Sequence, residues 1–121
     1  MKPLLADKFS EFLERFQNFE DAEFRTLEVI DATTMHATFA LQDGARAFDW
    51  ITLTLEFSGV SDAKLLSDTQ LPLVDMSSGI TLVKNNETLG FCIGNYTPSS
   101  LVDSISYIKF STLKYQEGIF S

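Results

Sequence analysis

The stretch "DWITLTLEF", Asp49 to Phe57, alternates apolar and polar residues without a break. Successive side chains of a strand point to opposite faces of a sheet, so this alternation predicts a strand with one buried and one exposed face. The apolar set is Ile51, Leu53, Leu55 and Phe57, and the other set is Trp50, Thr52, Thr54 and Glu56. We therefore expect a sheet with a core face and an outer face, and functional side chains belong on the outer face.

Two further strands are predicted just before this stretch. Their alternating residues are Leu27, Glu28 and Val29 in the first strand and Met35 to Leu41 in the second. If the two strands pair around a three-residue turn at 31–33, Val29 lies opposite Met35 and Glu28 lies opposite His36. With the stretch that starts at Asp49, they form an antiparallel meander with one apolar face.

The segment before the meander has the periodicity of an amphipathic helix. Its apolar residues fall on one stripe, which consists of Leu5, Phe9, Phe12, Leu13 and Phe16. Pro3 suits the first turn of a helix, and Asn18 suits the left-handed conformation that ends one. We expect this helix to pack on a mainly antiparallel sheet, which is an α+β fold.

The second half of the chain is less regular. Residues 59–76 break the period, and Pro72 permits at most an edge strand there. Residues 79–95 predict a hairpin around Asn85 and Asn86, since Asn accepts the positive φ of a tight turn. In residues 104–118 the parity of the apolar residues changes, which predicts a strand with both faces partly covered or a strand with a bulge.

Length and composition favour one globular domain over residues 1–121. The chain is 45% hydrophobic, with eleven Phe, which is enough for a packed core. Its net charge of −8 disfavours binding to nucleic acid and anionic membranes and favours a basic partner. The alternative is that the charge only keeps the protein soluble. Charges at Asp7, Lys8 and Glu11 interrupt the apolar start, so we expect no signal peptide, no membrane span and a cytoplasmic location.

Few residues can carry catalysis. On the outer face, Glu28 and His36 with Thr52 and Thr54 predict either a site for hydrolysis or small-molecule binding, or a solvated cross-strand ion pair. The second alternative is the commoner one. Cys92 lies between apolar neighbours and is expected to be a buried strand residue rather than a nucleophile. We expect no enzymatic activity and no cofactor.

Metal binding is equally poorly supported. Glu20, Asp21 and Glu23 offer three carboxylates within four residues, but they lack the spacing of a calcium loop. One His and one Cys cannot assemble a structural zinc site of the usual kinds. We expect no metal.

An interaction surface is the better-supported hypothesis. Trp50 has the polar parity of its strand, where it serves either as an interface anchor or as a cap on the sheet edge against residues 42–49. Asp43 and Asp49 flank it in sequence, and Glu56 shares its face. A basic partner would then meet an aromatic centre surrounded by acidic residues.

Three short motifs resemble the small bacterial proteins of the Immunity protein 50 family. They are FEDAE at 19–23, LEFSGV at 55–60 and LKYQEG at 113–118; the family often has His at the position of Glu20. The resemblance implies a cytoplasmic protein that binds and neutralises a cognate toxin domain. It makes Asp21 and Glu23 motif residues. We expect Asp21 to hold the helix-to-strand joint through its carboxylate, and Glu20 and Glu23 to add to an acidic rim.

Overall fold

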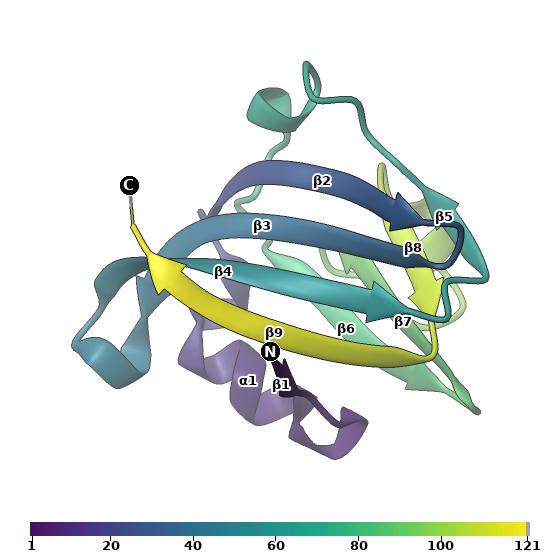
Figure 1. The fold of residues 1–121 in the computed structure, drawn as a ribbon, viewed down its shortest axis with the longest axis horizontal. Coiled ribbons are helices and arrows are strands. Elements are labelled where there is room, and N and C mark those ends of the chain that lie inside the picture. The colour runs from purple at the N-terminus through teal and green to yellow at the C-terminus, as the bar shows by residue number, and fades with distance from the viewer. Residues whose placement is uncertain (121) are drawn as a thin grey trace.

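The computed structural model describes residues 1–120, and its strands form two antiparallel sheets (Figure 1). The five-stranded sheet has the order β1-β9-β4-β3-β2, with β1 at Lys2–Pro3, β2 at Glu23–Asp31, β3 at Thr34–Asp43, β4 at Asp49–Ser58 and β9 at Thr112–Ile119. The four-stranded sheet has the order β5-β8-β7-β6, with β5 at Asp62–Lys64, β6 at Ile80–Asn85, β7 at Thr88–Ile93 and β8 at Tyr107–Phe110. The helix α1 spans Phe9–Arg15. The predicted α+β class is confirmed.

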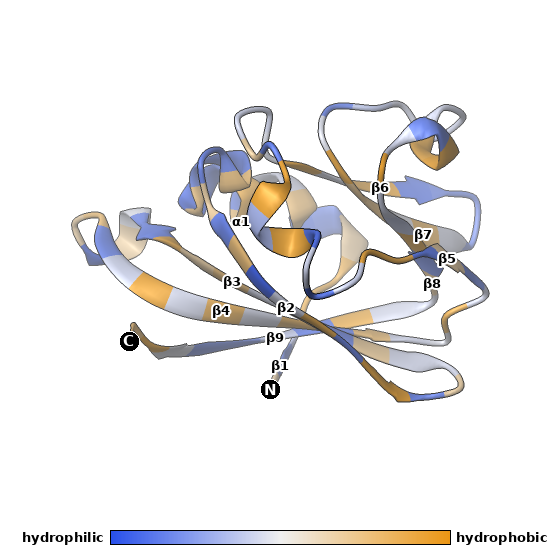
Figure 2. Ribbon diagram, turned by 90° about the horizontal axis from the view of Figure 1, so that it is seen from above, coloured by the Kyte–Doolittle hydropathy of each residue, from blue (hydrophilic) through white to orange (hydrophobic). Residues whose placement is uncertain are grey.

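Five short 3-10 turns connect these elements, at Ala6–Lys8, Gln17–Phe19, Gly44–Arg46, Leu71–Leu73 and Leu101–Asp103. Figure 2 shows α1 and the four-stranded sheet lying side by side on the same face of the five-stranded sheet. That face is the inner face. Within residues 1–120, no helix is long and apolar enough to span a membrane.

The meander β2-β3-β4 has the predicted register. Glu28 lies opposite His36 and Val29 opposite Met35, although the turn has two residues and β2 is bulged beside it. The expected apolar set of β4 is 4% exposed or less and faces the core. Val29 is 59% exposed because it lies near the turn, at the end of an edge strand.

Aromatic rings join the two sheets. The ring of Phe57 on β4 lies 5.0 Å from that of Phe91 on β7 and 4.9 Å from that of Phe110 on β8, measured between centroids. All three rings are buried. The core is therefore continuous between the five-stranded and four-stranded sheets.

The N-terminal helix begins later than predicted. Pro3 belongs to β1, opposite Lys114 of β9, and the Leu4 N–H donates to the carbonyl of Leu113 at 2.9 Å. These contacts hold the chain extended, so the helical turns begin only after Leu5. Leu4 is buried instead of Leu5, which is 67% exposed, and this corrects the predicted stripe at its first position.

The helix also ends earlier than predicted. Phe9, Phe12 and Phe16 are buried as expected, but α1 stops at Arg15. Asn18 adopts the predicted left-handed conformation, with φ of 57°, inside the following 3-10 turn. We call residues 17–22 the joint; they contain this turn and lead into β2.

The hairpin of β6 and β7 is confirmed. Its turn lies at Asn86 and Glu87, one residue later than predicted, and Asn86 has the positive φ, 58°. Pro72 lies in a 3-10 turn, and the only strand formed between residues 59 and 76 is the three-residue β5.

The tail is two strands rather than one. β8 pairs with β5 and β7, whereas β9 pairs with β4 and β1, so the chain changes sheets at Ser111. The Ser111 N–H donates to the carbonyl of Ser58 at 2.9 Å. Phe110 of β8 and Leu113 of β9 are both buried although their parities differ, because the chain changes sheets between them. Neither predicted alternative for the tail was right.

Candidate functional site

Four large apolar side chains are exposed near the place where β4 begins and β9 ends. We call them the aromatic patch: Phe48, Trp50, Ile119 and Phe120, which are 53%, 44%, 91% and 45% exposed. The register of β4 and β9 pairs Ile119 with Ile51, so the next residue, Phe120, lies at the level of Trp50. A hollow of about 350 Å³ is lined by three of the patch residues together with Arg46, Asp49 and Glu117.

Trp50 packs against a residue from near the other end of the chain. Its ring packs against that of Phe120, with 5.7 Å between centroids, and the guanidinium of Arg25 lies 5.1 Å from the centre of the Phe120 ring. Phe120 thus bridges side chains of β2 and β4. Part of the tryptophan is covered by this contact, and nearly half of it faces solvent.

An ionic cluster lies beneath the patch. Asp43 is fully buried and accepts two hydrogen bonds of 2.8 Å from Arg15 and one of 2.9 Å from the Ala45 N–H. Arg15 also donates to Glu117, which accepts a hydrogen bond of 2.8 Å from Arg46. This corrects the expectation that Asp43 faces a partner, because its carboxylate is enclosed by the protein's own arginines.

The charges of the cluster stabilise one another. The hydrogen bond from Arg15 lowers the pKa of Asp43 below its usual value and outweighs the burial, which acts in the opposite direction. Desolvation raises the pKa of Glu117, but the contacts with Arg15 and the charges of Lys2 and Arg46 lower it by more. The cluster joins α1, the loop at 44–48 and β9. It therefore fixes the segments that carry the aromatic patch.

Acidic residues border the patch on the side of the joint. Glu20 and Asp21 line a small hollow of about 90 Å³ together with Trp50. Glu23 lies 3.4 Å from Arg25, the residue stacked on Phe120. With Asp49 they form what we call the acidic rim: Glu20, Asp21, Glu23 and Asp49, all exposed.

Asp21 holds the joint, but not as expected. Its backbone N–H donates to the carbonyl of Met76 at 2.9 Å, and its φ is 60°, which Asp tolerates better than most residues. Its carboxylate forms no hydrogen bond within residues 1–120. The predicted carboxylate contact is therefore replaced by a backbone contact, and the side chain is left for the rim.

Glu56 lies away from the patch. It is six residues along β4 from Trp50, which is about 20 Å at the rise of a strand. Its carboxylate lies 2.8 Å from Nε2 of His36, so Glu56, rather than the exposed Glu28, orients the imidazole. This corrects both the place of Glu56 in the rim and the expected partner of His36.

The rest of the outer face is rich in hydroxyl groups. Thr38 and Thr54 share a hydrogen bond of 3.0 Å, and the Thr52 hydroxyl donates to the Ile119 carbonyl at 3.4 Å. Five hollows stand out on the surface of residues 1–120, and none is lined by Glu28, His36, Thr52 or Thr54. None of these five hollows therefore brings the four residues into one concave site.

The free cysteine lies inside the protein, away from this surface. Cys92 is buried in β7, as predicted, and burial raises the pKa of its thiol. Among residues 1–120, no group of three or more His, Cys, Asp or Glu is arranged to hold a metal ion.

The chain has no significant match among family models, curated proteins or solved structures. What the surface can bind therefore follows from its own chemistry.

Several site residues were missed from the sequence. Phe48, Ile119 and Phe120 were not singled out, because the tail was not recognised as the neighbour of β4. The one available signal was the run of apolar residues "IF" after Gly118, at the end of an alternating segment.

Proposed function

We propose that this protein is a non-enzymatic binding module that captures a basic protein partner, a cognate bacterial toxin domain, through the aromatic patch and the acidic rim. The observation that carries the proposal is Trp50, which is 44% exposed and held in place by Phe120. A tryptophan at the centre of an interface contributes strongly to affinity when a ring of polar residues excludes water around it.

Charge supports a basic partner. The net charge is −8, and four exposed carboxylates border the patch. Acidic residues at the rim of an interface accelerate association with a basic protein and discourage acidic ones. The resemblance to the Immunity protein 50 family supports a toxin as this partner. Many delivered toxins are nucleases, whose basic substrate groove an acidic surface can block.

A second candidate is a small-molecule-binding or hydrolytic domain on the outer face. The 2.8 Å contact between His36 and Glu56 favours it, because such a pair can act in acid/base catalysis. It is the weaker candidate, since catalysis needs a concave site and none of the five hollows described above is lined by His36 or Glu56. Turnover of a substrate that is lost in His36→Ala would support it over the binding module.

The decisive experiment starts with a pull-down of the protein from native cells, followed by mass spectrometry. With the partner in hand, Trp50→Ala should weaken binding by about 2 kcal/mol or more, mainly through faster dissociation. Leu73→Ala is the matched control, because Leu73 is 83% exposed and lies outside the patch. An unchanged dissociation rate for Trp50→Ala would place the interface elsewhere.

Charge reversal tests the acidic rim separately. Asp49→Lys should slow association and flatten its dependence on salt, because rim charges act mainly on the encounter rate. Asp103→Lys changes the net charge equally at another exposed position. If both variants slow association to the same degree, the rim has no specific role and only the overall charge matters.

A further inference from the structure

β6 is an edge strand of the four-stranded sheet, and it pairs with β7 on one side only. In an antiparallel pair, alternate residues exchange hydrogen bonds with the neighbour, and those between them point their backbone groups away. The Gly94 N–H donates to the Gly79 carbonyl at 2.8 Å, and the same register continues into β6. Thr81 and Val83 therefore bond to β7.

The backbone groups of Ile80, Leu82 and Lys84 consequently point to the free edge. Within residues 1–120, none of them forms a hydrogen bond to another part of the chain. Unpaired backbone groups are costly to bury, so such groups need either water or another chain as a partner. A row of donors and acceptors at strand spacing is complementary to one kind of ligand, which is another extended chain.

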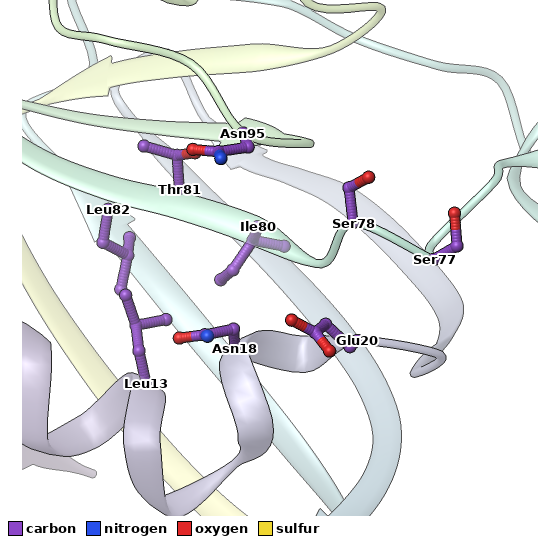
Figure 3. A pocket seen from close by; sticks show the side chains of 9 residues that line it. All are labelled: Leu13, Asn18, Glu20, Ser77, Ser78, Ile80, Thr81, Leu82 and Asn95. Carbon is purple, nitrogen blue, oxygen red and sulfur yellow. The ribbon is translucent and has the colours of Figure 1, made fainter.

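A groove of about 460 Å³ runs along this edge, between β6 and the joint. In Figure 3, Ile80 and Leu82 reach into the same space as Asn18 and Glu20, which come from the opposite wall. Ser78 and Asn95 add hydrogen-bonding groups. Backbone groups for a strand and side-chain groups for specificity therefore line one space, of a size usual for ligand sites.

Charge defines the ligand further. Glu20 is the one charged residue among those that line the groove. It is exposed, and it forms no ion pair within residues 1–120. We infer that the groove beside β6 binds an extended peptide segment of a partner, which adds a strand to the sheet and places a Lys or Arg side chain against Glu20. This groove shares Glu20 with the acidic rim, but none of the four residues of the aromatic patch lines it.

Selection from a display library of short random peptides, with the full chain as the target, tests this inference. We expect enriched peptides that combine β-branched residues with one Lys or Arg. Methylating the peptide amides that face β6 should weaken binding about tenfold each, and methylating the alternate amides should not, because only one set donates to the edge. Glu20→Gln should weaken binding about tenfold, while Glu14→Gln, at an exposed carboxylate on α1, should not.

Amide hydrogen exchange locates the peptide on the protein. Binding should slow exchange at Ile80, Leu82 and Lys84 and leave Thr81 unchanged. Failure to enrich peptides, or binding that is indifferent to which set of amides is methylated, would overturn the inference. Binding that is lost in Trp50→Ala and kept in Glu20→Gln would assign the peptides to the aromatic patch. Protection of the same three amides without peptide, together with a dimer in sedimentation, would identify a second copy of the chain as the occupant.

Discussion

The carboxylate of Asp43 has no exposure to solvent, yet it lies at the end of a strand, next to an exposed loop. Removing a carboxylate from water is costly unless hydrogen bonds and opposite charges replace the water. Arg15 supplies both, with two parallel hydrogen bonds, and the Ala45 N–H supplies a third. Asp43 is therefore a structural residue that supports the aromatic patch from below.

Removing this carboxylate should be costly. We expect Asp43→Ala to lower the free energy of unfolding by roughly 3 to 5 kcal/mol, because Arg15 loses its main partner. Arg46→Ala should cost less than about 1 kcal/mol, since that side chain is 52% exposed. Urea denaturation measures both variants. Equal losses would mean that Asp43 is not the centre of the cluster.

The same cluster should make stability depend on acid. The pKa of Asp43 is lowered in the folded protein, mainly by the hydrogen bond from Arg15, so the unfolded chain binds the proton more tightly. The stabilisation is present above the unfolded pKa, about 3.9, and is lost as the pH falls through the lower folded pKa. Both Asp43→Asn and Arg15→Ala should flatten this acid-induced loss in urea denaturation at several pH values. A loss as steep as in the parent protein would assign the effect to other carboxylates.

α1 stabilises the fold through aromatic contacts rather than through its length of seven residues. The ring of Phe12 lies 5.0 Å from those of both Phe16 and Tyr115 and 6.1 Å from that of Phe19. So short a helix is unstable alone in water. Packing on the inner face of the five-stranded sheet therefore maintains it.

Core substitutions test this packing. Phe12→Ala and Leu53→Ala should each lower the free energy of unfolding by roughly 2 to 5 kcal/mol, because each leaves a cavity between α1 and the sheet. Leu5→Ala should change it by less than about 0.5 kcal/mol, since Leu5 is 67% exposed. Thermal or chemical unfolding distinguishes these cases. Near-parental midpoints for both core variants would contradict the packing described here.

The joint depends on a glycine from another element. Gln17, Asn18 and Phe19 all have positive φ, and a Cβ on Gly79 would lie 1.9 Å from the carbonyl oxygen of Asn18. Gly79 itself has φ of +68°. The left-handed turn therefore fits against the chain before β6 only because position 79 has no side chain.

Gly79→Ala should consequently cost at least about 2 kcal/mol of unfolding free energy and displace the joint. Gly118→Ala is the control: its Cβ would meet only the movable hydroxyl of Thr52, at 2.5 Å, so it should cost less than about 1 kcal/mol. Denaturation midpoints give the energies, and amide chemical shifts of the joint report its displacement. Similar costs for the two variants would argue against a specific fit at Gly79.

The two sheets share one core, and the chain crosses between them at Ser111. Neither sheet can lose its inner face without exposing Phe57, Phe91 and Phe110. We therefore expect the whole chain to unfold in a single cooperative transition, as a small single domain does.

Two probes test this cooperativity. The fluorescence of Trp50 reports on the five-stranded sheet, and the reactivity of the buried Cys92 thiol reports on the four-stranded sheet. Their urea midpoints should coincide, and Phe91→Ala should lower both together. Separate midpoints would show two independently folding units and would contradict the prediction of one domain.

The sequence by itself determined the elements whose signal is local. Alternation in residues 49–57 and in the two preceding segments predicted β2, β3 and β4 with their register. The pattern of apolar and polar residues within each strand indicates which face is buried. The same parity predicted that Trp50 faces outward, and chain order placed the acidic residues of the joint before β2. The α+β class and the β6–β7 hairpin followed from the same local signals.

Only the tertiary structure decided what depends on distant residues. Asp43 and Asp49 have the same chemistry and both flank the loop before Trp50, but Arg15, 28 residues away, buries the first and leaves the second exposed. Leu4 is buried in place of Leu5 because β1 pairs with β9, at the other end of the chain. The tail divides between two sheets, which pairs Ile119 with Ile51 and brings Phe120 to Trp50. Contacts between segments far apart in the chain determine these outcomes, and a local sequence pattern cannot predict such contacts.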